Sequence, residues 1–232
     1  MGILLSLFLI WQAGHRHTLN CEAANVQVTV TPMLGDTAYD FSADVLSIQA
    51  MANGVVHQVR AGWALGLTDY VSVLSMEAPI AVTPRARGTF CAAPQRIGVV
   101  IGYKNVTVHM PRELSGDSCG FQQILAHENK HLMVNREVTQ KFSALAETKI
   151  RSYLATNGGV EDESADAAAG AARHGLQALL QEIAWQMLRE NEAGQIDVDG
   201  PEEYRRLLSV CDGELADLVK RTRDERRLAA SF

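Results

Sequence analysis

Two histidines and a glutamate stand close together in the segment His127-Glu128-Asn129-Lys130-His131, which has the pattern H-E-x-x-H. A separation of four residues places both imidazoles on one face of a helix, one turn apart. Two imidazoles in this arrangement can share a tetrahedral Zn²⁺, and Glu128 can take a proton from a water on the metal. The sequence therefore predicts a Zn²⁺ site with His127 and His131 as ligands and Glu128 as the catalytic base.

The segment that carries this motif has the pattern of a long helix. Asp117 and Ser118 are good N-cap residues, and from Phe121 onward apolar residues recur at helical spacing until Asn157-Gly158-Gly159 ends the run. A second helix is predicted over about 165–191 from its apolar stripe. A third, long helix begins at Gly200-Pro201, with proline in the first position and acidic residues behind it.

The residues before these helices have the pattern of strands. Valines alternate with polar residues in Asn25–Thr31 and again in the second half of Ile97–Met110, and Tyr70–Leu74 is apolar and β-branched. Alternation with one polar face is typical of antiparallel strands that are packed on one side. Strands followed by helices predict an α+β fold, with a mostly antiparallel sheet before three long helices and the H-E-x-x-H motif on the first of them.

The N-terminus has the order of a signal peptide. The apolar run Ile3–Ile10 precedes small residues and a polar stretch, which predicts cleavage after about residue 14 and export to the periplasm or the medium. The predicted organisation is a signal peptide over 1–14, a β-rich region over 15–110 and a helical region over 111–232. Residues 25–232 are expected to form one compact unit.

Charge and hydropathy narrow the list of partners. The chain has 21 Lys and Arg against 27 Asp and Glu, a formal net charge of −6, and no basic block that would follow a phosphate backbone. No stretch beyond the N-terminus approaches the roughly 18 apolar residues of a membrane helix. We therefore expect no nucleic acid and no membrane partner after signal removal, and a peptide or protein as substrate.

The four cysteines are Cys21, Cys91, Cys119 and Cys211, and none forms a C-x-x-C pair. An even number of separated cysteines in an exported chain predicts two disulfides, for which three pairings exist. We predict the pairs Cys119–Cys211 and, by exclusion, Cys21–Cys91, because the first pair suits antiparallel packing of the first and third helices.

The same register argument suggests a third metal ligand. His127 lies eight residues after Cys119 and Glu203 lies eight residues before Cys211, so both lie about 12 Å from the bridge along their helices. Glu203 is the predicted third ligand, whereas His174 is expected to lie several turns from the metal. The alternatives are Glu202 and then Glu190.

A sheet followed by a long helix with the sequence HENKH resembles the zincin metallopeptidases, over about residues 95–211. The metzincin extension is absent, because Val134 and Glu137 stand where that subfamily has glycine and histidine. The resemblance is therefore to the gluzincins, and it implies a downstream glutamate as third ligand and an edge strand that holds an extended peptide. The chain is also similar to exported bacterial proteins described as zinc-dependent proteases.

Three further side chains are candidates for a hydrogen bond to a tetrahedral intermediate. Tyr204 is preferred, and Tyr103 and His109 are weaker candidates, since each is of a type that also occurs half-buried in cores. Together these features predict an exported zinc-dependent metallopeptidase. The alternative is a non-catalytic zincin-like binding or structural module of the cell envelope.

Overall fold

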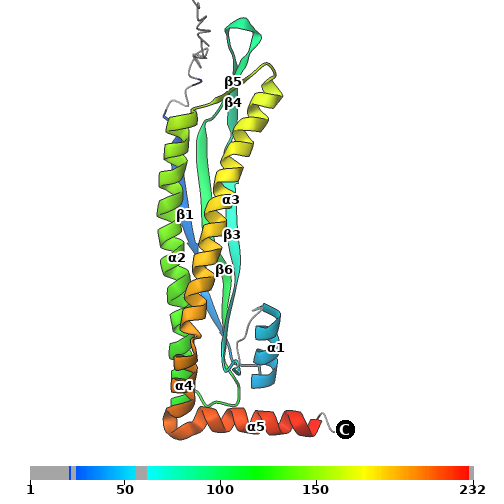
Figure 1. Cartoon of the computed structure of the whole chain (residues 1–232), viewed down its shortest axis with the longest axis vertical. Helices are drawn as coiled ribbons and strands as arrows, with labels where there is room; N and C mark the ends of the chain where they lie inside the picture. The colour runs from blue at the N-terminus through cyan, green and yellow to red at the C-terminus, as the bar shows by residue number, and fades with distance from the viewer. Residues whose placement is uncertain (1–20, 22–24, 56–61, 230–232) are drawn as a thin grey trace, which may run out of the picture.

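The computed structural model describes residues 21, 25–55 and 62–229, which form an α+β fold of a long helical hairpin on a mixed sheet (Figure 1). The strands are β1 (Gln27–Leu34), β2 (Thr37–Asp40), β3 (Leu67–Glu77), β4 (Ile80–Pro84), β5 (Phe90–Pro94), β6 (Arg96–His109) and β7 (Val160–Asp162). The α-helices are α1 (Val45–Val55), α2 (Cys119–Asn157), α3 (Ala165–Val198), α4 (Pro201–Ser209) and α5 (Glu214–Ala229), and Ala86–Gly88 and Cys211–Gly213 form short 3₁₀ turns η1 and η2.

Helix α2 carries the H-E-x-x-H motif and has the ends that the sequence predicts. The Ser118 hydroxyl accepts a hydrogen bond from the backbone N–H of Phe121, which satisfies one of the free donors at the helix start. At the other end Gly158 has a φ of 54°, and its N–H donates to the carbonyl of Leu154. The 39 residues between these caps contain no proline, so the helix continues without a break.

Strand β6 is the centre of the main sheet, and the sheet is mixed. On one side β6 pairs in parallel with β1 and, further along, with β2, and on the other side it pairs antiparallel with β3. The prediction of a mostly antiparallel sheet is therefore wrong for β1 and β2. Parallel pairing arises because β1 and β6 are far apart in sequence and need no hairpin between them, whereas alternation in one strand carries no information about the direction of its neighbour.

The hydrophobic core lies between this sheet and the α2–α3 hairpin. Both long helices run antiparallel along one face of the sheet (Figure 1), and their apolar stripes meet alternate residues of β6. Central members of the core are Ile101, Phe142, Ala146, Ile150 and Ile183, each at most 3% exposed. The contact fixes the rotation of α2, and with it the direction in which the histidines project.

The predicted third helix is two helices. The chain leaves α4 at Val210 and enters α5 at Glu214 through Cys211, Asp212 and Gly213, which all have positive φ. Left-handed residues cannot continue a right-handed helix, so α5 departs from the direction of α4 and crosses the end of the molecule (Figure 1). The apolar pattern did not reveal this break because Leu207, Leu215 and Leu218 are buried in one cluster on both sides of it.

Both disulfides join the predicted pairs. Cys21 is bonded to Cys91, and Cys119 at the start of α2 is bonded to Cys211 in the turn between α4 and α5. Two disulfides indicate that the protein matures in an oxidising, extracellular environment. Within the described residues no helix is long and apolar enough to cross a membrane. The predicted signal peptide over 1–14 lies outside the described residues.

Gly102 allows β1 to approach β6 closely. Its φ is 144°, and a Cβ there would lie 2.1 Å from the Met33 carbonyl oxygen on β1. We expect Gly102→Ala to lower the free energy of unfolding by at least about 2 kcal/mol, from strain and steric overlap. Gly98→Ala on the same strand is the control, since a Cβ there meets no atom within 4 Å. Denaturant titration of both variants measures the difference, and equal midpoints would contradict this account.

Candidate metal centre

The two histidines of the motif point their Nε2 atoms at the same place. His127 and His131 lie one turn apart on α2 and are each 8% exposed, and their Nε2 atoms are 3.2 Å apart. Their rings are nearly perpendicular, with centroids 4.9 Å apart. His127, Glu128 and His131 form a buried group whose ligand atoms lie within 4.8 Å of one another, and such a group could hold a metal ion.

A carboxylate completes this arrangement, and it comes from Asp199. Its Oδ1 atom lies 3.2 Å from Nε2 of His127 and 3.2 Å from Nε2 of His131, so the three atoms form an equilateral triangle. Ligands of a tetrahedral Zn²⁺ at 2.0–2.1 Å are about 3.3 Å from one another. Two imidazole nitrogens and a carboxylate oxygen at this spacing therefore fit a zinc ion.

Asp199 reaches the histidines because α3 is longer than the sequence pattern suggested. The helix continues beyond the predicted end near residue 191 to Val198, and Asp199 is its C-cap. Gly200 and Pro201 then start α4 in a new direction, so the Asp199 carboxylate lies at the junction between two helices. Its side chain is 59% exposed, which leaves one side of the group open to solvent.

Glu203, the predicted third ligand, lies on the other side of the His127 ring. Its Oε1 atom is 3.4 Å from Nδ1 of His127, the nitrogen that does not face His131, and the side chain is 16% exposed. Lys130 donates to the same oxygen at 2.6 Å, and Arg206 donates to both oxygens at 2.8 and 2.9 Å. The glutamate is thus held by two cations where it can accept the Nδ1 proton of His127.

His131 has a matching partner in Gln195. The Gln195 Oε1 atom lies in short hydrogen-bond contact with Nδ1 of His131. Each histidine therefore has an acceptor for its Nδ1 proton, which leaves its Nε2 lone pair directed at the triangle.

Glu128 lies on the buried side of the group. It is 2% exposed, and its Oε2 atom accepts a hydrogen bond of 2.7 Å from the Thr68 hydroxyl on β3. Gly66, which precedes β3, lies so close that a Cβ there would be 2.5 Å from Oε1 of Glu128. The start of β3 therefore covers this carboxylate, and only a glycine at 66 allows so close a contact.

The carboxylates at this centre have displaced pKa values. Burial raises the pKa of Glu128, and the charges of His131 and His127 and the Thr68 hydrogen bond oppose this only in part. Burial alone would raise the pKa of Asp199, but its hydrogen bonds to His127 and His131 outweigh burial and lower it. The pKa of Glu203 is lowered mainly by its hydrogen bonds to Arg206, with a further contribution from Lys130.

The protonation of His131 reflects the same partners. Burial lowers its pKa, but the Asp199 hydrogen bond and the charges of Glu128 and Asp199 outweigh burial, so the net pKa is raised. The group therefore concentrates negative charge around two imidazoles, as a divalent cation requires.

The remaining predicted residues are occupied elsewhere. The Tyr204 hydroxyl accepts a hydrogen bond of 3.2 Å from the backbone N–H of Trp63. The Glu202 side chain is 92% exposed beside Arg205, and Glu190 pairs with Lys141 at 2.6 Å, so neither lies with the histidines. Tyr103 is a core residue 1% exposed, His109 bridges Asp40 and Asp69, and His174 lies on the surface of α3.

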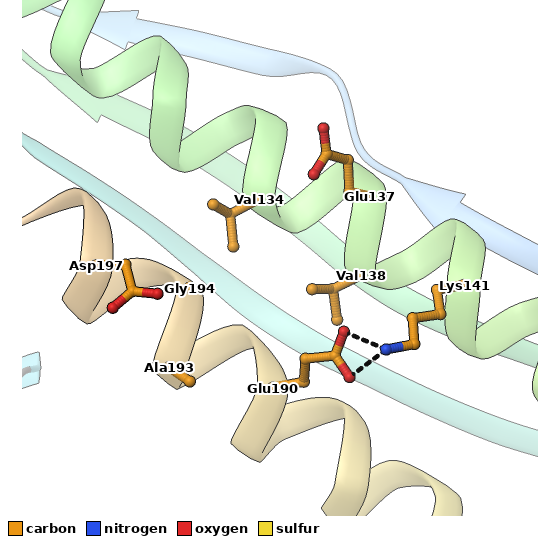
Figure 2. Close-up of a pocket in the computed structure, with 8 residues that line it drawn as sticks. All are labelled: Val134, Glu137, Val138, Lys141, Glu190, Ala193, Gly194 and Asp197. Atoms are coloured by element: carbon orange, nitrogen blue, oxygen red, sulfur yellow. Dashed lines mark hydrogen bonds and ion pairs between the residues drawn. The ribbon is translucent and has the colours of Figure 1, made fainter.

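A separate hollow of about 400 Å³ lies between α2 and α3, and Figure 2 shows its lining. Its floor is apolar, from Val134, Val138 and Gly194, and the Lys141–Glu190 ion pair borders one end (Figure 2). No member of the His127–Glu128–His131 group lines it. The hollow is therefore distinct from the candidate metal centre.

Three residues of the centre carry no signal in the sequence. Each lies 60–72 residues along the chain from the motif residue that it contacts; the three are Asp199, Gln195 and Thr68. The only trace of Asp199 is its place before Gly200-Pro201, which marks a helix junction.

Comparison of the chain with protein-family models, with curated proteins and with solved structures found no match.

Asp199 and Glu203 face different nitrogens of His127, which predicts different effects of their substitution on metal binding. We expect Asp199→Ala to weaken Zn²⁺ binding by at least about 100-fold, because it removes one of three ligand atoms, and Glu203→Gln to weaken it by about 10–100-fold. Asp197→Ala and Glu202→Gln are the matched controls, since both side chains lie outside the triangle. Titration against a chromophoric chelator measures each affinity. A larger loss in Glu203→Gln than in Asp199→Ala would make Glu203 the ligand.

Proposed function

We propose that the protein is a zinc-dependent metallopeptidase that acts outside the cytoplasm, in the periplasm or the medium. The single observation that carries the proposal is the triangle of His127 Nε2, His131 Nε2 and Asp199 Oδ1 with Glu128 buried beside it. His127, His131 and Asp199 would hold the Zn²⁺, and Glu203 would support His127 instead of ligating.

The ligand set favours a catalytic over a structural site. Structural zinc sites have four protein ligands and are closed, whereas catalytic sites have three and keep a fourth position for water or substrate. Here three ligand atoms converge, and the Asp199 side is exposed to solvent. This openness is the observation that favours an enzyme over the alternative, a non-catalytic zincin-like module. A bound Zn²⁺ would lower the pKa of water and polarise the scissile carbonyl.

Glu128 has the position of a general base. It follows His127 directly in the sequence and lies within the same group, so its carboxylate can take the proton of an attacking water and pass it to the leaving amine. Thr68 holds one carboxylate oxygen, which fixes the direction of the other. The buried position excludes bulk water from the carboxylate and strengthens its interaction with nearby positive charge.

Strand β3 supports a peptide as the substrate. Among the described strands β3 pairs with β6 alone, so its other edge offers backbone N–H and C=O groups. The strand begins beside Glu128, through the Thr68 contact. An extended peptide that added to this edge would lie next to the metal centre, in the manner of strand addition. The resemblance to the zincins implied an edge strand in this role, and of the strands that pair with β6 alone, β3 is the one that contacts Glu128.

Removal of the base tests the mechanism. We expect Glu128→Gln to keep Zn²⁺ stoichiometry and to lower the rate of peptide hydrolysis by about 10²–10⁴-fold, because the amide cannot accept the proton. Glu137→Gln, on the same helix but outside the centre, is the control. Cleavage of a mixed peptide library by the zinc-loaded protein, read by mass spectrometry, provides the measurement. Equal cleavage by Glu128→Gln and the parent would contradict the mechanism.

The contact between Thr68 and Glu128 predicts a smaller effect. Thr68→Val preserves the shape of the side chain and removes the hydroxyl donor to Oε2. We expect kcat to fall by about 10-fold with little change in KM, since the hydroxyl orients the base and does not bind substrate. Steady-state kinetics on a peptide found by the library screen measures both constants. A rise in KM with unchanged kcat would instead assign Thr68 to substrate binding.

A further inference from the structure

A chain of hydrogen-bonded amides connects His131 to strand β3. The Gln195 Nε2 atom donates to Oδ1 of Asn135 at 2.9 Å and lies 3.4 Å from Oδ1 of Asn191. Asn191 in turn donates through Nδ2 to the hydroxyl of Tyr70 on β3, at 2.7 Å. Asn135 and Asn191 are 4% and 3% exposed, although polar side chains are seldom buried in the middle of a helical hairpin.

These partners fix the orientation of the Gln195 amide. Its Nε2 faces the side-chain oxygens of Asn135 and Asn191 and, at 3.4 Å, the backbone carbonyl of His131. All three are acceptors, so the nitrogen must lie on this side and the oxygen Oε1 must face Nδ1 of His131. A reversed amide would place a donor against the Nδ1 proton and two oxygens against each other.

The Gln195 amide in turn sets the orientation of Asn191. Because Nε2 of Gln195 faces Oδ1 of Asn191, Nδ2 of Asn191 is left to donate to the Tyr70 hydroxyl. Burial raises the pKa of Tyr70, so the phenol remains neutral. The Tyr70 ring packs against Tyr103 at a centroid distance of 4.7 Å, which anchors the hydroxyl to the core.

We infer that Gln195 is a positioning residue of the metal centre, and that the hydrogen-bonded chain Tyr70–Asn191–Gln195 holds His131 in the tautomer and ring orientation that directs Nε2 at the metal. The inference rests on the proposed function, and it names a residue that no H-E-x-x-H pattern includes. Glu203 contacts Nδ1 of His127 with a charged carboxylate, whereas Gln195 contacts Nδ1 of His131 with a neutral amide.

The chain also places β3 and His131 in one network. Thr68 and Tyr70 are both on β3, and they contact Glu128 and Asn191 respectively. Strand β3 is therefore connected by hydrogen bonds to Glu128, directly through Thr68, and to His131, through Tyr70, Asn191 and Gln195. A peptide that ordered this edge would order the supports of both groups.

The test compares three variants of the full-length protein. Gln195→Leu removes the acceptor, and we expect it to weaken Zn²⁺ binding by about 10–100-fold. Gln195→Glu restores an acceptor, and we expect affinity within about 3-fold of the parent. Reversal of the Asn135 amide would let Nδ2, which has no hydrogen-bond partner among the described residues, donate to the new carboxylate. Gln186→Leu, on the same helix and paired only with Glu182 in the described hydrogen bonds, is the matched control and should bind as the parent does.

The readouts are Zn²⁺ affinity and the visible absorption spectrum of the Co²⁺-substituted protein. Neither measurement requires the protein to hydrolyse a peptide. A reoriented His131 should shift the Co²⁺ bands of Gln195→Leu, whereas a loss of fold stability alone would leave the bands of the folded fraction unchanged. Tyr70→Phe alone should weaken Zn²⁺ binding. Added to Gln195→Leu, it should cause no further loss of affinity, since both residues act through one chain of hydrogen bonds.

Each failure has its own signature. A parent that binds no Zn²⁺ overturns the proposed function, and the positioning role with it. A parent that binds Zn²⁺ through Asp199, together with a Gln195→Leu variant of equal affinity and unchanged spectrum, overturns the positioning role alone. If Gln195→Leu does not fold, Gln195→Glu decides: affinity near that of the parent supports the acceptor role, and a loss of 10-fold or more overturns it.

Discussion

The two helices of the α2–α3 hairpin converge on one point at its open end, where the Nε2 atoms of His127 and His131 meet Oδ1 of Asp199 at 3.2 Å. This meeting requires α2 and α3 to have a fixed rotation, a fixed spacing and a shared register over many turns. A shift of one residue along α3 would move Asp199 by about 1.5 Å and rotate it by about 100°. The apolar stripes that pack on β6 provide this precision, because close-packed interiors resist such shifts.

The polar residues between the helices act over a shorter range. The core toward the far end of the hairpin is apolar, with Phe142, Ala146 and Ile150, but nearer the metal centre Asn135, Thr139 and Asn191 are buried instead. Buried amides cost stability unless they are paired, so their presence indicates a positional role. The stability of the hairpin comes from the apolar half, and the orientation of His131 comes from the polar half.

The disulfides complete the support from outside the core. Cys119–Cys211 connects the first residue of α2 to the turn after α4, eight residues from His127 and eight from Glu203. This crosslink restrains the helix that carries Glu203, whose ion pairs with Lys130 and Arg206 lie nearer the surface. Such pairs contribute little by themselves in water, so the covalent link and the Leu207 contact determine the place of α4.

The local features of this protein followed from its sequence. The H-E-x-x-H motif, the Ser118 cap, the end of α2 at Gly158 and the fold class are properties of short segments, in which residue type and spacing act directly on the backbone. Both disulfide pairs followed from the helix register between Cys119 and Cys211.

The tertiary structure alone decided the parallel pairing of β1, the break between α4 and α5, and the identity of the residues around the histidines. The register argument placed Glu203 beside His127, where it faces Nδ1, whereas Asp199 at the end of α3 faces Nε2. A linear register gives the height along a helix and not the side of the ring that a carboxylate reaches. Gln195 and Thr68 contact the motif only because packing brings α3 and β3 against α2, and no pattern within either segment records that contact.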